Sequence, residues 1–437
     1  MQKSPLAEAD TLCEELLQDL PADVAGLARE FKAFTRGRKI KTPQQLLRVV
    51  LLYCGLDQSL REVAGTLTVL GEQITDSSVI TRLKAGEPWV KALLKRMLPG
   101  LSELALPAGY RFRVLDGSSI EGPGANGTWY RLHLSIDLCR LSFTEIIVSD
   151  KHTGESVAHF ALGAGDVAVM DRGYCRPQAL IDVVAAGAQV VVRWNSAIPL
   201  WDRDGQPLDL VQTLRRQAAE QGVVPVLMGP AAGQNRIAGY LHACRLPPEQ
   251  AEAARRRLRR TAQKKGRTLK QATLYLAGWV VFTSLPPTVL ATQTVLALYR
   301  LRWQVELAIK RWKSVLDVDG LRAKEGSTLA QVWLHGKLLY ARLLERHARR
   351  LNGEQWGYLD QPRHATWWRP WKLMAQAIAP LITGAAYWQP AQWAACIELI
   401  KERPRRRQLQ RFPAAVMRLM RDACPTGIAP PLQALAA

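Results

Sequence analysis

Apolar residues recur at helical spacing through the first hundred positions, and two stretches there begin with helix-capping patterns. Thr42 precedes Pro43, a glutamine follows three residues after Thr42, and the apolar run Leu46–Tyr53 comes next. The tetrapeptide Ser59–Glu62 has similar spacing and opens a helix that ends near residue 70. A hydroxyl three residues ahead of Glu or Gln satisfies free backbone N–H groups at a helix start. This region is therefore predicted to be helical.

A third helix is expected over Ser78–Lys84, capped by Asp76 or Ser77 after a short glycine-containing turn. Two helices joined by such a turn are typical of a helix-turn-helix. An ordinary helical bundle has the same pattern, so both interpretations stay open at this point. Two basic side chains within the third helix favour the DNA-binding interpretation.

The periodicity changes from helical to alternating after Pro107. Apolar and polar residues alternate over Tyr130–Leu138, and a β-rich run follows. The predicted order is strands at 110–115, 130–138 and 141–148, a short helix at 156–162, a strand at 167–170, a helix at 176–186 and a strand at 189–194. A meander of three strands followed by alternating helices and strands predicts a mixed α/β sheet.

Residues 195–275 interrupt this rhythm. Short β-like runs at 223–228 and 236–244 precede the basic helix Glu249–Lys265, which contains five arginines. We expect a β-rich insertion whose helix either follows a phosphate backbone or is only a solvated surface helix. The α/β pattern then resumes with a strand at 278–283, a long helix at about 292–316 and another helix at about 328–349.

Composition narrows the kind of partner. The chain has 437 residues, 48% of them hydrophobic, and a formal net charge of +21, which predicts a globular protein that binds a polyanion such as nucleic acid. A generically basic protein is the alternative. Seven cysteines without a CxxC pair, and an N-terminus without signal-peptide order, point to the cytoplasm. The uncharged stretches 272–299 and 373–397 contain prolines and are expected to be buried core, so no membrane association is predicted.

Two aspartates stand where apolar strands end. Asp116 follows Tyr110–Leu115 and precedes a glycine, and Asp171 follows Val167–Met170 and lies two residues before another glycine. Adjacent strands would bring two such carboxylates together at an accessible sheet edge, where oxygen ligands suit Mg²⁺. Each motif by itself is also a common turn former.

A third carboxylate lies on the long helix after the insertion. Tyr299, Arg302, Glu306 and Lys313 share one helical face by their spacing. An apolar stripe runs beside that face: Leu298, Leu301, Val305, Ile309, Trp312 and Leu316. A solvated charged face is the alternative, but a single glutamate among cations is expected beside phosphates.

Other acidic residues compete for a metal role and rank below these three. Asp137 and Asp166 sit within or at the start of strands, and Glu121 lies in a glycine-rich loop. The histidines show no ligand pair at metal spacing, and no Walker-type phosphate loop occurs. Zinc chemistry and nucleotide hydrolysis are therefore disfavoured.

The spacing Tyr-x2-Arg-x3-Glu-x6-Lys at 299–313 resembles the signature of the insertion-sequence-four family of DDE transposases. Asp-Gly-Ser at 116–118 and Asp-Arg-Gly-Tyr at 171–174 resemble the first two acidic motifs of that family, and the similarity covers about residues 30–350. The resemblance implies an α/β, ribonuclease-H-like catalytic core with a β-rich insertion, flanked by helical N- and C-terminal domains. The expected parts are a helical DNA-binding domain (1–100), the two parts of the core (101–194 and 276–350), the insertion (195–275) and a helical C-terminal region (351–437).

The family also implies roles for single residues. Asp116, Asp171 and Glu306 would be catalytic and would hold two Mg²⁺ ions, for which Mn²⁺ can substitute. The DNA-binding residues implied by the resemblance are Tyr299, Arg302 and Lys313, which would hold phosphates, Trp279, which would stack on a flipped base, and Trp303, which would support that pocket. For both tryptophans a place in the core is the alternative.

The function implied by the resemblance is Mg²⁺-dependent cleavage and strand transfer at the terminal inverted repeats of a bacterial insertion sequence, by cut-and-paste. The partners would be double-stranded DNA, as transposon ends and target, and a second copy of the chain in a homodimeric synaptic complex. The protein would be cytoplasmic and associated with the nucleoid. A decayed or domesticated DNA-binding protein without cleavage, or a ribonuclease-H-like nuclease, is the alternative. The basic cluster Arg403–Arg411 either contacts DNA or serves as a linker.

Overall fold

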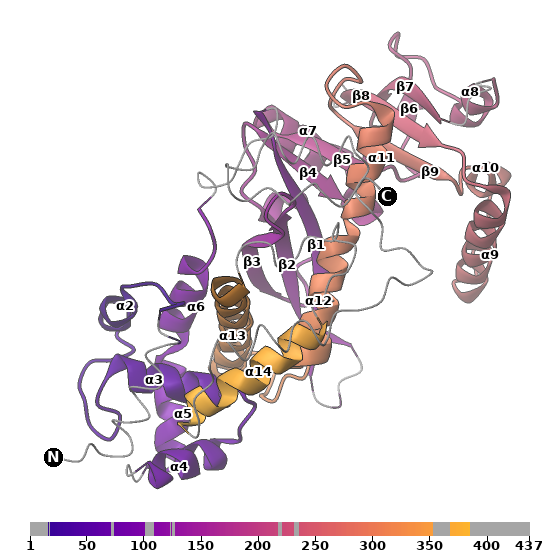
Figure 1. Cartoon of the computed structure of the whole chain (residues 1–437). Coiled ribbons are helices and arrows are strands. Elements are labelled where there is room, and N and C mark those ends of the chain that lie inside the picture. Colours follow the sequence, from indigo (N-terminus) through magenta and orange to yellow (C-terminus); the bar gives the residue numbers. More distant parts are fainter. Residues whose placement is uncertain are drawn as a thin grey trace, which may run out of the picture.

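The fold is described from a computed structural model. It covers residues 16, 18–70, 74–100, 109–122, 124, 127–216, 221–230, 236–352 and 368–384. Its described part is elongated, with N-terminal helices at one end, a sheet in the middle and the elements of 200–275 at the other end (Figure 1). Residues 353–367 and 385–437, including Arg403–Arg411, lie outside the described residues, as does the turn at 71–73.

The N-terminal region is helical, as its capping patterns predict. Its elements are α2 (Val24–Glu30), α3 (Pro43–Val50), a π-helical segment (Leu51–Gly55), α4 (Leu60–Val69), α5 (Asp76–Ala85) and α6 (Glu87–Arg96). The Thr42 hydroxyl accepts the Gln45 N–H at 3.1 Å. Ser59 and Glu62 form the reciprocal capping box, which confirms both predicted helix starts.

The predicted cap of the third helix was wrong by one or two residues. Thr75 is the N-cap of α5, and its hydroxyl accepts the Ser78 N–H at 3.3 Å. Asp76 is already helical, and its carboxylate accepts the neighbouring Ser77 N–H instead. An extended threonine before an acidic first turn can cap the helix as well as the residues predicted for that role.

The N-terminal helices pack closely against α13 (Thr328–Asn352), and two glycines allow this approach. A Cβ at Gly336 would stand 2.6 Å from the Cys54 sulfur, and a Cβ at Gly55 would stand 2.9 Å from the Tyr340 ring. Lys337 lies fully buried beside them and pairs with Asp57. The helical end of the molecule is therefore built from both the start and the later part of the described chain (Figure 1).

Among the described residues, nine strands form one sheet in the order β3-β2-β1-β4-β5-β9-β8-β7-β6. The strands are β1 (Arg111–Glu121), β2 (Thr128–Asp137), β3 (Ser142–Asp150), β4 (Asp166–Met170), β5 (Gln189–Arg193), β6 (Leu200–Trp201), β7 (Gln221–Met228), β8 (Ile237–Cys244) and β9 (Trp279–Thr283). The first three form the expected antiparallel meander, and β4 and β5 follow in parallel with β1. This mixed α/β sheet fits the ribonuclease-H-like fold.

Residues 195–275 extend the core sheet, although the sequence reads there as an interruption. Strand β8 pairs antiparallel with β9, which itself pairs with β5. Beyond β8 lie β7 and β6, with α8 (Leu210–Arg216), α9 (Pro248–Lys264) and α10 (Gln271–Tyr275). The basic helix predicted at Glu249–Lys265 is α9, and it projects from the end of the molecule (Figure 1).

Helices cover both faces of the central strands. On one face, α11 (Thr292–Leu301) and α12 (Trp303–Leu316) share a hydrophobic core with the N-terminal helices, α13 and α14 (Trp368–Thr383). On the other face, α7 (Pro177–Ala185) packs over a second cluster that includes Leu115 and Tyr174. The apolar stripe predicted for 298–316 is buried or partly buried, as expected.

The single long helix predicted at about 292–316 was wrong, because it is broken at Arg302. The Arg302 N–H bonds to Tyr299 O, and the Val305 N–H bonds to Arg302 O, so the chain takes three-residue instead of four-residue steps there. The helix predicted at 156–162 also shrinks to one 3₁₀ turn, Val157–His159, because Phe160 after it is extended.

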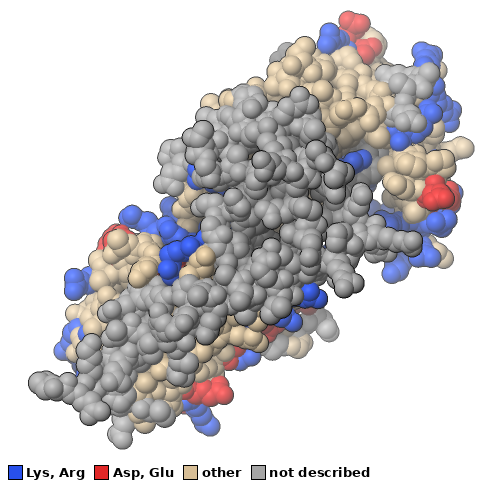
Figure 2. All heavy atoms as spheres, in the orientation of Figure 1, with Lys and Arg blue, Asp and Glu red and all other residues tan. Residues whose placement is uncertain are grey.

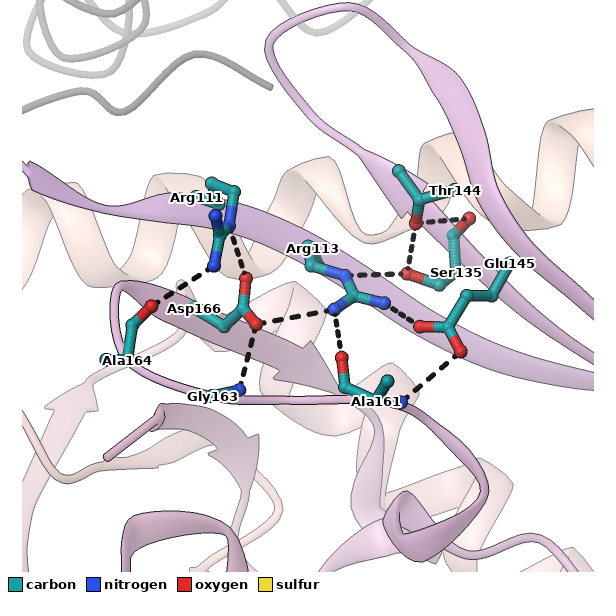
Figure 3. A network of polar contacts seen from close by, with 9 residues as sticks. All are labelled: Arg111, Arg113, Ser135, Thr144, Glu145, Ala161, Gly163, Ala164 and Asp166. Atoms are coloured by element: carbon teal, nitrogen blue, oxygen red, sulfur yellow. Dashed lines mark hydrogen bonds and ion pairs between the residues drawn. The ribbon is translucent and has the colours of Figure 1, made fainter. Parts of the chain in front are cut away.

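A buried polar network holds β1, β2, β3 and the segment before β4 together (Figure 3). The Arg113 guanidinium is fully buried and donates to Ser135 Oγ, Ala161 O and the carboxylates of Glu145 and Asp166. Arg111 donates to the same Asp166 at 2.7 Å. The network holds the start of β4 against β1. It therefore also positions the other end of this short strand, which Asp171 follows.

No helix in the described part of the chain is both long and apolar enough to cross a membrane. The uncharged stretch that begins at Leu373 forms part of α14, where Met374, Ile378 and Leu381 are buried. This agrees with the core role predicted for it over its described residues.

Candidate active site

The register of β1 and β4 brings Asp116 and Asp171 to the same level. The predicted strand end at Asp116 was wrong, because β1 stays paired with β2 beyond this residue, whereas Asp171 does follow the end of β4. Val114 pairs with Val169 in this parallel ladder, so Asp116 and Asp171 each lie two residues beyond the last pair. Strand β4 stops at Met170, whereas β1 continues to Glu121. The sheet therefore opens on this side of β1, next to both aspartates.

Asp171 is held by the turn that it caps. Its carboxylate accepts the Gly173 N–H at 2.7 Å, at the start of the 3₁₀ turn Arg172–Tyr174. The carboxylate of Asp116 similarly accepts the N–H of Gly117 at 2.9 Å. Each carboxylate is thus held by the backbone N–H of a glycine one or two residues after it.

The charge of Asp116 is poorly compensated. Burial, together with the charges of Asp171 and Glu306, raises the pKa of Asp116 to about 7, although Arg302 and the Gly117 N–H act to lower it. Three carboxylates from β1, the end of β4 and α12 are therefore within electrostatic reach of one another. Such a group favours binding of a cation.

Arg302 already supplies one positive charge at this place. Its Nη1 lies 3.2 Å from Asp116 Oδ2, and its Nη2 lies 2.5 Å from Glu306 Oε1. The guanidinium is only 16% exposed, and the break between α11 and α12 falls at this residue. The helix break and the acidic site therefore coincide.

The other two residues of the predicted helical face also point to β1 or to Arg302. Lys313 donates its Nζ to Ser119 O at 2.8 Å and lies 3.6 Å from Asp319. Tyr299 is buried, and its ring centroid lies 6.0 Å from the guanidinium carbon of Arg302. Burial raises the pKa of Tyr299, so its hydroxyl stays protonated.

The donor chemistry of the site fits Mg²⁺ or Mn²⁺, because carboxylate oxygens are the ligands that these hard cations take. Among the described residues, no group of three or more His, Cys, Asp or Glu side chains stands close enough to chelate a metal ion as arranged. The Arg302 guanidinium donates to both Asp116 and Glu306, so a positively charged side chain bridges these two carboxylates.

The competing carboxylates have other partners. Asp166 binds Arg111 and Arg113 in the buried network, and Asp137 accepts the Arg140 N–H at 2.8 Å at the end of β2. Burial raises the pKa of Asp137 to about 6. The sequence predicted that Glu121 lies in a glycine-rich loop, but it is the last residue of β1. All three remain outside the site.

A cleft of about 810 Å³ adjoins the acidic residues, and Asp171, Tyr299 and Arg302 line it. Of the described residues, five arginines line this cleft, namely Arg172, Arg176, Arg193, Arg257 and Arg302. The arginine from α9 brings the basic helix of 248–264 to the same opening. Lys and Arg side chains also gather at the end of the molecule that carries α8 to α10 (Figure 2).

The structure describes the side chain of only one of the two tryptophans that were predicted to bind DNA. Trp303 is 46% exposed, is not among the residues that line the cleft, and has Lys310 Nζ at 4.8 Å from its ring centroid. The side chain of Trp279, at the start of β9, lies outside what the structure describes, although Gly278 lines the cleft.

One acidic residue next to the site was missed by the sequence reasoning. Glu155 lies between β3 and β4, and its carboxylate stands against Gly117 and Gly173. The sequence offered one signal for such a neighbour. A glycine follows each of the candidate aspartates Asp116 and Asp171 by one or two residues, and a glycine lets another side chain approach the backbone closely. Nothing in the sequence says which residue makes that approach.

An acidic site at the open side of a mixed sheet, next to an arginine-lined cleft, is typical of enzymes that process nucleic acid. A family model described as "Transposase DDE domain" matches residues 107–341. This range contains β1 to β9, all five cleft arginines named above and the three acidic candidates.

The chain is similar to named transposases over most of its length. The putative transposase InsL for insertion sequence element IS186A of Escherichia coli (strain K12) is 33% identical over 334 residues, 74% of this chain and 90% of that protein. The transposase for insertion sequence element IS421 of Escherichia coli is 33% identical over 335 residues, with the same shares. The transposase for IS231F of Bacillus thuringiensis subsp. israelensis is 34% identical over 93 residues, 20% of this chain and 19% of that protein.

The chain therefore belongs to the DDE transposases. It is an enzyme of insertion sequence elements that catalyses DNA cleavage and strand transfer, and DNA is its partner. DDE transposase domains generally depend on divalent metal ions.

Proposed function

We propose that this chain moves an insertion sequence of the insertion-sequence-four family by Mg²⁺-dependent cut-and-paste transposition, with Mn²⁺ as a substitute. The observation that carries the proposal is the Arg302 guanidinium between Asp116 and Glu306, beside the strand-end Asp171. The Arg302 guanidinium thus places a positive charge where β1, the end of β4 and α12 bring acidic groups together. The Tyr299-to-Lys313 spacing supports the family within the DDE transposases.

Asp116, Asp171 and Glu306 hold two divalent ions in this proposal. When bound, these ions lower the pKa of the attacking water or 3′-hydroxyl and offset charge on the leaving oxygen. Asp116 needs ion neutralisation because burial and the charges of Asp171 and Glu306 disfavour its charged form. Arg302 then transfers its hydrogen bonds from Asp116 and Glu306 to a phosphate near the scissile bond, which its planar guanidinium can bind with two N–H groups.

The remaining residues position the DNA strand. Lys313 holds a phosphate on the β1 side, and Tyr299 supports Arg302 from the cleft side. The cleft arginines follow the backbone by neutralising phosphates. Trp279 stacks on a base displaced from the duplex, and Trp303, which is exposed, contacts DNA at the rim instead of inside the cleft.

The proposed assembly is a homodimer that pairs two transposon ends. One protomer binds each end and the active site of its partner cuts it. Mixing active protein with a cleavage-deficient variant tests the paired assembly, because a mixed dimer with one active site for each end cleaves only one of its two ends. The helical N-terminal region, with α4 and α5 as the two helices of a helix-turn-helix, is the proposed end-binding domain.

The decisive assay uses the full chain, Mg²⁺ and a labelled duplex that carries the inverted repeat flanking its own gene, with a second duplex as target. Nicking followed by joining supports the proposal. Nicking without joining supports a ribonuclease-H-like nuclease, and binding alone supports a DNA-binding protein without cleavage.

The site assignment has its own test in the same assay. Asp116→Asn is expected to remove cleavage and leave binding to the duplex unchanged, because the side chain keeps its shape and loses its charge. Glu30→Gln, an exposed position on α2 at the far end of the molecule, is the matched control and should cleave normally. Cleavage by Asp116→Asn at the normal rate would contradict the assignment.

A further inference from the structure

Glu155 places a fourth carboxylate beside the three acidic candidates. Its Oε2 would be 3.4 Å from a Cβ at Gly173, and Asp171 Oδ1 would be 3.0 Å from the same point. The two oxygens therefore both border one position where no side chain stands. Because Glu155 lies on the connection between β3 and β4, it reaches the site from an element that carries none of the other three.

Gly117 makes room for this carboxylate on the β1 side. A Cβ at Gly117 would stand 2.7 Å from Glu155 Oε1 and 2.9 Å from its Cγ, both closer than atoms can pack. Gly117 directly follows Asp116, and Gly173 lies two residues after Asp171. The glycines next to the two aspartates thus form a cradle in which the Glu155 carboxylate lies.

The segment that holds Glu155 is anchored to the sheet. His159 Nε2 donates to Gly154 O at 2.8 Å, and the ring of His159 packs against that of His133 on β2, with centroids 4.3 Å apart. Burial lowers the pKa of His133 to about 4, so the ring against which His159 packs is neutral. The backbone next to Glu155 is therefore tied to β2 through His159.

No cation within the described part of the chain pairs with Glu155 or with Asp171. Two neighbouring carboxylates without a counterion repel each other, at a cost that a bound cation removes. Arg302 cannot serve both pairs, because its two terminal nitrogens are used by Asp116 and Glu306. Among the residues that the structure describes, no ion pair therefore balances the carboxylates on the Asp171 side, although Arg172, Arg176 and Arg193 line the same cleft as Asp171.

Tyr174 is a second, independent sign of a binding position there. Its side chain is 1% exposed, and its hydroxyl has no hydrogen-bond partner among the described residues. Burial, and then the charges of Glu155, Asp116 and Asp171, raise the pKa of Tyr174, which places this hydroxyl within electrostatic reach of all three. A buried hydroxyl without a protein partner is a group that a water or another ligand can satisfy.

We propose that the Glu155 carboxylate binds the divalent ion on the Asp171 side of the site, and that the glycine at 117 admits it there. This inference rests on the proposed metal-dependent function. It makes Glu155 a fourth acidic ligand of the site and gives Tyr174 a water on that ion as its hydrogen-bond partner.

The test measures Mn²⁺ binding to the full chain without DNA, by the electron paramagnetic resonance signal of free Mn²⁺. Glu155→Gln keeps the shape of the side chain and removes its charge, so we expect Mn²⁺ affinity to fall by roughly ten- to a hundred-fold. The Mn²⁺-induced rise in Tm should shrink in parallel. Glu30→Gln is the matched control and should bind Mn²⁺ as the unaltered chain does.

A pair of alanine variants tests the glycine cradle. Gly117→Ala should weaken Mn²⁺ binding, because the new Cβ displaces the Glu155 carboxylate. In a Glu155→Ala background the same glycine change should add little, since the group that it displaces is gone. Equal losses in both backgrounds would overturn the role of the cradle.

The outcomes separate this inference from the proposed function. Loss of Mn²⁺ binding in Asp116→Asn together with normal binding in Glu155→Gln overturns the role of Glu155 and leaves the metal site standing. Absence of Mn²⁺ binding by the unaltered chain overturns both. Weakened binding in Asp116→Asn and Glu155→Gln alike, with unchanged far-ultraviolet circular dichroism, supports both.

Discussion

Arg302 and Asp116, 186 positions apart in the chain, form an ion pair of 3.2 Å between Nη1 and Oδ2. The same guanidinium pairs with Glu306 at 2.5 Å. In this arrangement an arginine from the helix break balances two of the acidic residues proposed to hold metal. From this position we expect Arg302 to weaken metal binding to the DNA-free protein and to promote cleavage of DNA.

Replacing Arg302 should separate those two effects. Arg302→Gln removes the cation that competes for Asp116 and Glu306, so Mn²⁺ should bind the DNA-free protein more tightly than it binds the unaltered chain. Cleavage should nevertheless fall by about 100-fold or more, because a preorganised charge near the scissile phosphate is lost. Metal titration and the rate of nicking measure the two effects on the same sample. Weaker Mn²⁺ binding would contradict the competition.

Asp116 should make the metal-free protein less stable as the pH rises. Burial raises its pKa from 3.8 to about 7, so the folded state binds the proton more tightly than the unfolded state does. Its contribution to stability is fully present below about pH 4 and is lost as the pH rises through 7. The Asp116→Asn side chain does not ionise, so the stability of this variant does not fall in this way as the pH rises.

The measurement is the free energy of unfolding in urea with a chelator present, from pH 4.5 to 8. The stability of Asp116→Asn relative to the unaltered chain should increase steadily across that range. A difference that stays constant with pH would show that Asp116 is ionised throughout, and a difference that decreases would reverse the sign of the predicted shift.

The arginine of α9 that lines the cleft should contact DNA, and a neighbour on the same helix provides the comparison. Arg257→Ala should weaken duplex binding and lower the slope of log affinity against log salt by about 1, as expected for one lost phosphate contact. Arg256 is exposed but does not line the cleft, so Arg256→Ala should change the slope much less. Equal slopes for the two variants would place the DNA elsewhere.

Arg113 should be important for stability and not for chemistry. Arg113→Met leaves the carboxylates of Asp166 and Glu145 without their buried partner, which should cost about 3–5 kcal/mol in the free energy of unfolding. Arg111→Met is the milder control, because that side chain is partly exposed and Arg113 still pairs with Asp166. Urea unfolding of both variants measures the difference, and equal losses would argue against the buried network in Figure 3.

Local patterns in the sequence predicted much of the fold. Helix starts at Thr42 and Ser59 were correct because a cap is decided by residues three positions apart. The strand that ends at Asp171 and the buried stripe of 298–316 were correct because burial repeats with the period of the element. The cap at Thr75 and the break at Arg302 were missed, since several side chains could serve as the cap and since the break depends on what the helix packs against.

The sequence alone singled out the candidate residues for chemistry along each element: an aspartate after each of two apolar runs, and a glutamate among cations on one helical face. Tertiary structure decided which other groups meet them, namely the Arg302 bridge, the Glu155 carboxylate in its glycine cradle and the extension of the sheet by β8 and β9. The physical reason is that periodicity reports which face of an element is buried. It carries no information on the distant segment that covers that face.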